Sequence, residues 1–282
     1  MKQILFLILI TATMISCETT PTETTEAAQE PLASSTNKVV LYSEIEWSPL
    51  NPARGDQSPQ AGTIWGDRNG KEATGFLVKF ANGFSSPPHI HNVTYRGTVI
   101  KGLVHNDDPK AEKMWMPAGS FWTQPAGEPH ITAANGTENI AYIEIDHGPY
   151  LVKPVDEAFD EGERPLNIDQ SNIVWVNLSE KVKGPQVSYL WGKPEASEVY
   201  GMYLKLPPGF AGKLIHSGST FHAVVIDGPI DYHLQGEEGT KTLNAGSYFS
   251  SAESSAHHLS GNRESATVIY VRTNGTVDVK TD

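Results

Sequence analysis

The sequence predicts an all-β protein built from two copies of one barrel-type domain, and three observations support this fold class. Gly and Pro are frequent, with 25 and 19 residues among 282, as expected for a chain with many tight turns. Short runs of β-branched and aromatic residues, such as 76–80, 140–145 and 267–271, are separated by turn signals such as Asn135-Gly136. Finally, similar residues recur at a nearly constant spacing along the chain.

The repeat covers most of the chain. Trp65-Gly66 recurs 126 residues later as Trp191-Gly192. Further along, the spacing becomes 127, so that His130 corresponds to His257. Because each copy contains short strands and no convincing helical period, we expect two tandem jelly-roll β-barrels.

The N-terminus predicts export and a lipid anchor. Lys2 precedes an apolar run from Ile4 to Ile10, which is too short for a membrane span. Cys17, the only cysteine, stands where a bacterial lipobox has its lipidated residue. The alternative is an ordinary secretory peptide with an incidental cysteine.

The rest of the chain divides at a change in composition. Residues 18–37 are rich in Thr, Glu, Pro, Ala and Ser, which predicts a disordered tether. We expect the protein at the cell envelope, lipid-anchored on a periplasmic or extracellular face, or secreted if it is not lipidated. The predicted organisation is a lipoprotein signal peptide (1–17), a linker (18–37), a first barrel with a metal site (38–155) and a degenerate second barrel (156–282).

The charge of the chain limits its partners. The formal net charge is −12 and the isoelectric point is about 5.3. A strongly acidic surface repels phosphate backbones, so nucleic acid is excluded as an expected partner. A small-molecule substrate or ligand is the expected partner, with membrane contact only through the lipid anchor.

Three histidines form the main candidate site. His89 and His91 are two residues apart, so on a strand both side chains point to one face. His130 follows a Pro/Gly turn at 125–127 and supplies a third imidazole. Neutral imidazole suits iron, zinc, nickel or copper better than magnesium or calcium. The sequence therefore predicts a metal site made by these histidines.

The residues around the histidines resemble the two signatures of the cupin superfamily. The first is Gly83-x5-His89-x-His91-x3-Tyr95-x6-Gly102, with Tyr95 where the family usually has an acid. The second is Gly119-x5-Pro125-x-Gly127-x2-His130, with Ala134 where the family usually has Asn. Within the superfamily, the chain resembles ChrR-like cupins and bacterial two-cupin lipoproteins.

This resemblance implies a jelly-roll barrel with a divalent metal at its mouth, bound by His89, His91 and His130. Since the family's carboxylate ligand is missing, the set looks more like that of the three-histidine iron oxygenases. Fe(II) is therefore favoured, with Zn, Mn, Ni and Cu as alternatives. Tyr95 is the candidate catalytic residue, and it could bind metal, hydrogen-bond a substrate or fill space. Cupins commonly dimerise, so the resemblance also implies a homodimer.

The second copy allows two alignments. At a spacing of 126, Tyr95 corresponds to Phe221 and the paired histidines are lost, which predicts a degenerate site. At a spacing of 127, a different set remains as a second candidate metal site, consisting of His216, His222 and His257.

Two classes of function follow from these patterns. The first is a metal-dependent enzyme that resembles the cupin dioxygenases and oxygenates a small organic molecule at open metal positions. The second is an envelope-anchored protein that binds or senses a small ligand or metal without catalysis. One barrel fold supports many chemistries, so the site must decide between them.

Overall fold

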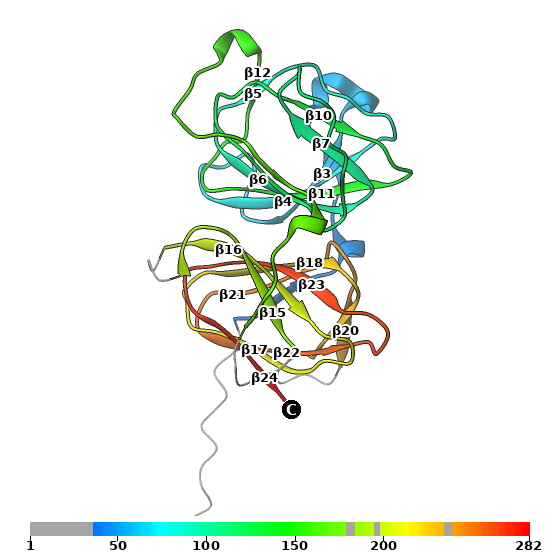
Figure 1. The fold of residues 1–282 in the computed structure, drawn as a ribbon, viewed down its shortest axis with the longest axis vertical. Helices are drawn as coiled ribbons and strands as arrows, with labels where there is room; N and C mark the ends of the chain where they lie inside the picture. The colour runs from blue at the N-terminus through cyan, green and yellow to red at the C-terminus, as the bar shows by residue number, and fades with distance from the viewer. Residues whose placement is uncertain (1–35, 179–183, 195–197, 234–238) are drawn as a thin grey trace, which may run out of the picture. The chain divides into compact units, whose positions relative to one another are not determined.

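The computed structural model describes residues 36–178, 184–194, 198–233 and 239–282, which belong to one compact unit, Thr36–Asp282 (Figure 1). The predicted all-β class is confirmed, because regular structure in these ranges consists of strands and four short 3-10 helices. The helices are η1 (Tyr42–Glu44), η2 (Pro52–Gln57), η3 (Val155–Glu157) and η4 (Gln170–Asn172). In the described part, no helix is long and apolar enough to span a membrane. The predicted signal peptide and Cys17 lie outside the described residues.

The first barrel combines a seven-stranded antiparallel sheet with two smaller sheets (Figure 1). The runs predicted at 76–80 and 140–145 form neighbouring strands of the large sheet, with Tyr142 opposite Leu77. In order, the large sheet is β13 (Leu166–Ile168), β9 (Phe121–Gln124), β6 (Tyr95–Lys101), β11 (Asn139–Ile145), β4 (Thr74–Phe80), β3 (Gln60–Trp65) and β2 (Ser48–Pro49). The smaller sheets are β10 (Ile131–Ala134), β7 (Leu103–Asp107) and β8 (Met116–Pro117), and β12 (Val152–Lys153) with β5 (Ile90–His91).

The second barrel combines a seven-stranded sheet with a five-stranded sheet. In order, the large sheet is β1 (Lys38–Val40), β21 (Tyr248–Ser251), β18 (Phe221–Asp227), β23 (Thr267–Thr273), β16 (Tyr200–Leu206), β15 (Gln186–Trp191) and β14 (Val176–Asn177). The smaller sheet is β20 (Thr240–Leu243), β19 (Ile230–His233), β22 (Ser255–Gly261), β17 (Ala211–His216) and β24 (Val277–Thr281). The two large sheets match strand for strand, so the repeat in the sequence is also a repeat in the fold.

The two barrels exchange their first strands. β1 precedes every strand of the first barrel, yet it pairs with β21 in the second barrel, with Val39 opposite Phe249. In the same way, β13 lies beyond residue 155 but pairs with β9 of the first barrel, with Asn167 opposite Trp122. Strand pairing thus crosses the expected boundary between residues 155 and 156 in both directions.

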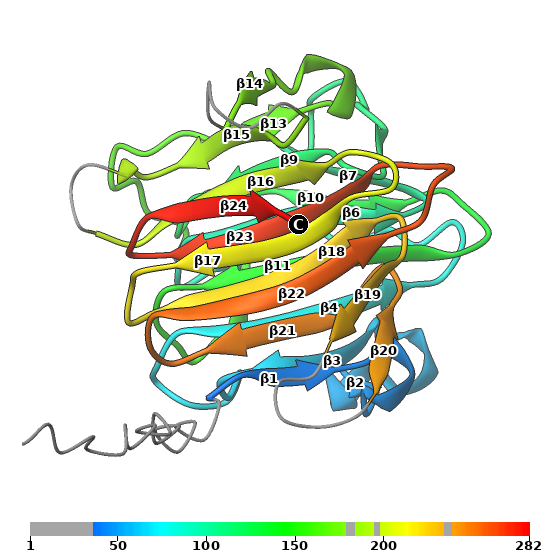
Figure 2. The same cartoon turned by 90° about the horizontal axis from the view of Figure 1, so that it is seen from below.

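The core has three parts. One apolar cluster fills each barrel, and a third lies between the two large sheets, where residues of both repeats pack together. Figure 2 shows the strands of these two sheets lying over one another. Across this layer, the Tyr203 hydroxyl donates to Thr98 Oγ1 at 3.1 Å, so the repeats share one interior.

A charged group is buried in the layer between the sheets. Glu144 on β11 is only 1% exposed. Its carboxylate accepts hydrogen bonds from the hydroxyls of Tyr142 at 2.9 Å and Tyr270 at 2.7 Å. Arg272 of the second repeat lies 3.3 Å from the same carboxylate and 2.8 Å from Asp146. A hydrogen-bonded ion pair therefore joins the two repeats.

Candidate metal centre

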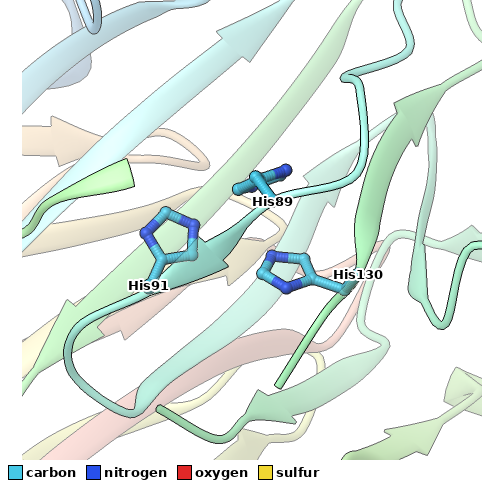
Figure 3. A group of neighbouring side chains, drawn as sticks. All are labelled: His89, His91 and His130. Atoms are coloured by element: carbon cyan, nitrogen blue, oxygen red, sulfur yellow. The ribbon is translucent and has the colours of Figure 1, made fainter. Parts of the chain in front are cut away.

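The three predicted histidines meet inside the first barrel, at one end of β5 and β10. His89 and His130 form a bridge in which each backbone N–H donates to the other residue's carbonyl at 3.0 Å. On β5, Ile90 points into the core, so His89 and His91 point to the opposite face. Figure 3 shows the three rings turned toward a common centre. One ring nitrogen of each lies within 4.8 Å of the others, and all three side chains are buried.

Backbone carbonyls set the tautomer of all three rings. Nδ1 of His89 lies 2.9 Å from the carbonyl oxygen of Pro87, Nδ1 of His91 lies 3.1 Å from that of Leu151, and Nδ1 of His130 lies 3.0 Å from that of Glu128. A carbonyl only accepts, so each Nδ1 carries the proton and each Nε2 keeps its lone pair. All three Nε2 atoms are thereby the acceptor atoms of their rings, which is the form that a ligand in the centre requires.

The surroundings keep these rings neutral. Burial lowers the pKa of His130 to about 3, with a further contribution from the neighbouring His89. Burial and the two other imidazoles hold the pKa of His91 well below its usual value. The pKa of His89 is lowered by burial and, in smaller part, by the positive charge of Arg54. Neutral imidazole is the form that binds a metal.

Tyr95, the predicted catalytic residue, lies beside the histidines as a buried phenol. Its hydroxyl donates to Asn106 Oδ1 at 2.8 Å and lies 3.3 Å from Nε2 of His130. Asn106 is fixed in turn, since its amide donates to Gln124 Oε1 at 2.9 Å. Burial raises the pKa of Tyr95, so the hydroxyl stays protonated at neutral pH. In this structure the Tyr95 hydroxyl therefore acts as a hydrogen-bonding group.

A second tyrosine was missed by the sequence analysis. The hydroxyl of Tyr150 lies 3.0 Å from Nε2 of His91, and the two rings stack with centroids 4.2 Å apart. Tyr150 belongs to the segment after β11, where no cupin signature falls. Its position could not be read from spacing, because only the three-dimensional return of the chain brings it to His91.

A cavity of about 280 Å³ adjoins the site. His89, His91 and Tyr95 form part of its wall, and most of the remainder is apolar or aromatic. Such a lining suits a small organic molecule. The histidine centre is thus buried, yet it faces a space that a substrate can occupy.

The second repeat retains only part of this arrangement. Leu214 lies opposite His257, as His89 lies opposite His130, so an aliphatic side chain replaces one histidine. His216 and His257 remain, but the hydroxyl of Ser251 bridges their Nε2 atoms at 2.5 and 3.1 Å. Phe221 stacks on both rings, with centroids 4.4 and 4.8 Å away.

His222 lies apart from this pair. It is next to Phe221 on β18 and so points to the other face of the strand. There its ring stacks on Trp65 at 4.0 Å, and its Nδ1 lies 2.7 Å from the Tyr248 hydroxyl. The structure does not bring the predicted second set together. Within the described ranges, only His89, His91 and His130 form a cluster of three such ligands.

Comparisons with known proteins place the chain in a family and in a fold. Residues 38–280 match the family described as a domain of unknown function, DUF4437. A search of curated proteins finds no significant match.

Solved structures with similar folds include several cupins. A candidate dioxygenase from Nostoc punctiforme has a TM-score of 0.65 and 14% identity, covering 89% of this chain and 88% of its own. Salicylate 1,2-dioxygenase from Pseudoaminobacter salicylatoxidans has a TM-score of 0.56 and 12% identity, covering 91% and 88%. Oxalate decarboxylase from Bacillus subtilis has a TM-score of 0.56 and 12% identity, covering 91% and 80%. At such identities the likeness shows the fold alone. The chain therefore has the cupin fold and belongs to the DUF4437 family.

Proposed function

We propose that the protein is a metal-dependent cupin enzyme, oxygenase-like in its chemistry, that acts on a small organic molecule in the cavity of the first barrel. One observation carries this proposal. Backbone carbonyls hold all three Nδ1–H groups, so the Nε2 lone pairs of His89, His91 and His130 converge beside an apolar cavity.

The donor set fits a transition metal. Three neutral imidazoles suit Fe(II), Zn, Mn, Ni or Cu, and their carbonyl partners orient the rings as metal-binding histidines require. Tyr95 stands where cupins usually have an acidic ligand, so three protein ligands are proposed. An ion bound there would supply Lewis-acid or redox chemistry at the coordination positions left open. Fe(II) is the proposed ion.

The surrounding side chains have separate tasks in this proposal. Asn106 accepts the hydroxyl proton of Tyr95 and holds the phenol near His130, where its oxygen can accept a hydrogen bond from a substrate. Tyr150 places a second hydroxyl beside His91. The apolar wall keeps bulk water from the reacting molecule. Fold neighbours described as dioxygenases support the oxygenase class.

The first experiment measures metal and oxygen together. The protein is purified without chelator, and its metal content is compared with that of His130→Ala and of the control His222→Ala. We expect about one metal ion per chain, lost in His130→Ala and kept in His222→Ala. Oxygen uptake with Fe(II) is then measured on a panel of diketones, hydroxylated aromatics and thiols. Bound metal with ligand binding but no turnover would favour the sensing protein instead, and no metal after reconstitution would refute the proposal.

We also propose a lipid anchor at Cys17 and a homodimer. The support is the position of this single cysteine after an apolar run and the family tendency to dimerise. Mass spectrometry of the mature N-terminus and membrane fractionation of Cys17→Ser test the anchor. A mature chain without lipid, in the soluble fraction, would contradict it. Light scattering of the purified protein tests the dimer.

A further inference from the structure

The wall of the first-barrel cavity contains one charged side chain, since its histidines are neutral. Most of the wall is aliphatic or aromatic, as with Val78, Phe84, Trp122 and Ile143. The exception is Arg54, on the short helix η2 between β2 and β3. The Arg54 side chain is exposed, so its charge stands where the cavity meets solvent, in reach of an anion that enters the apolar space.

Several uncharged polar groups of the wall accept or donate hydrogen bonds within the protein. Ser86 Oγ accepts from the backbone N–H of Thr132 at 2.9 Å, and the Thr132 hydroxyl donates to Asn106 at 2.8 Å. Asn51 Oδ1 accepts from the N–H of Ala53 at 3.1 Å and so begins η2. The Ser86 and Asn51 oxygens are therefore partly satisfied, and neither group carries a charge that could balance an anion.

Arg54 differs from them. Among the described residues, no carboxylate pairs with its guanidinium, although the chain carries a net charge of −12. Its only recorded side-chain contact in that part of the protein is the ring of Phe84, 6.0 Å away. Arg54 and His89 line the same cavity. The guanidinium is therefore available to an anion that occupies the space beside the histidines.

We propose that the cavity selects a small monocarboxylic acid, whose carboxylate pairs with Arg54 and whose apolar body, a single ring or a short branched chain, fills the space beside the histidines. The planar guanidinium matches a carboxylate through two parallel hydrogen bonds. One cation balances one negative charge, and 280 Å³ lies at the small end of ligand sites. As a substrate class this assignment rests on the proposed enzyme function, but the binding site itself does not require the metal.

The test measures binding to metal-free protein, which separates it from the metal assay. Isothermal titration compares benzoate with benzamide, which has the same ring and no charge. We expect benzoate to bind the wild type about tenfold more tightly, as a charge-assisted hydrogen-bond pair would give. Arg54→Gln should abolish this preference, and Arg54→Lys should keep part of it. Arg263→Gln, at an exposed arginine in a turn of the second repeat, is the matched control and should bind like the wild type.

Each contrary result has a clear reading. Equal affinities for benzoate and benzamide, or an unchanged preference in Arg54→Gln, would overturn the proposal. So would no binding of benzoate, phenylacetate or 3-methylbutanoate up to about 10 mM, because a built site for these acids should bind more tightly than that limit. Selective binding in a protein that takes up no metal would support the carboxylate site while refuting the metalloenzyme. Metal binding without selectivity would do the reverse.

Discussion

Removing the carboxylate of Glu144 should strongly destabilise the protein. In Glu144→Ala, the buried hydroxyls of Tyr142 and Tyr270 lose their acceptor, and Arg272 keeps only the half-exposed Asp146 as an ion-pair partner. At present Glu144 and Asp146 hold the pKa of Arg272 above its usual value in spite of its burial. Breaking a buried ion pair costs about 3–5 kcal/mol. For a domain of this size, that loss lowers the Tm by about 10 °C.

Urea unfolding followed by fluorescence and circular dichroism measures this change, with Glu138→Ala as the matched control. Glu138 also forms an ion pair, with Lys101 at 3.0 Å, but both side chains are about half exposed. Its loss should therefore cost less than about 1 kcal/mol. Because Glu144 joins the two repeats, its variant should also show a broader transition or two transitions. Equal stability of the two variants would refute the reasoning.

Three further predictions concern the barrels themselves. In metal-free protein, burial lowers the pKa of His130 and His257 to about 3 each, so the free energy of unfolding is highest above pH 6.5 and falls as the pH is lowered. At pH 5, each histidine should lower the free energy of unfolding in urea by about 2 kcal/mol. A free energy of unfolding that does not change with pH would contradict this. Gly97→Ala places a Cβ inside the ring of Trp122, so we expect a loss of about 1–3 kcal/mol in the same assay, and wild-type stability would show that the ring can move. His216→Phe should still bind one metal ion per chain by elemental analysis, and a lower metal content would implicate the second barrel.

Local geometry predicted only the pair of the histidine cluster, because a spacing of two on a strand places His89 and His91 on one face. The third member, His130, was assigned through the resemblance to the second cupin signature, and the structure places it opposite His89. By contrast, Arg54 and Tyr150 reach the cavity from segments with no pattern of their own. Their placement depends on tertiary contacts that spacing does not encode.

The two possible alignments of the second repeat show where sequence spacing is insufficient. Three residues separate His91 from Tyr95, whereas four separate His216 from Phe221. The offset between corresponding residues of the two repeats therefore changes in the turn between these positions. As a result, neither the offset of 126 nor that of 127 aligns the residues on both sides of the turn. Strand register resolves this, because His257 lies opposite Leu214. The strand exchange could not be predicted from the sequence either, because the partner of an edge strand is determined by tertiary packing and not by a local pattern.

The exchanged strand β1 affects the order of events during synthesis. β1 is synthesised before any other described strand, but its partner β21 is made only after more than 200 further residues. The hydrogen bond from Ser255 to Asn37, next to this strand pair, likewise joins positions 218 apart. At typical elongation rates of about 5–20 residues per second, β1 waits on the order of 10–40 s for its partner. During that time it is an unpaired edge, and its three-residue length and its lysine reduce the risk of pairing with another chain. The second barrel closes its sheet edge with the first described strand of the chain, so its folding is completed only after β21 is available.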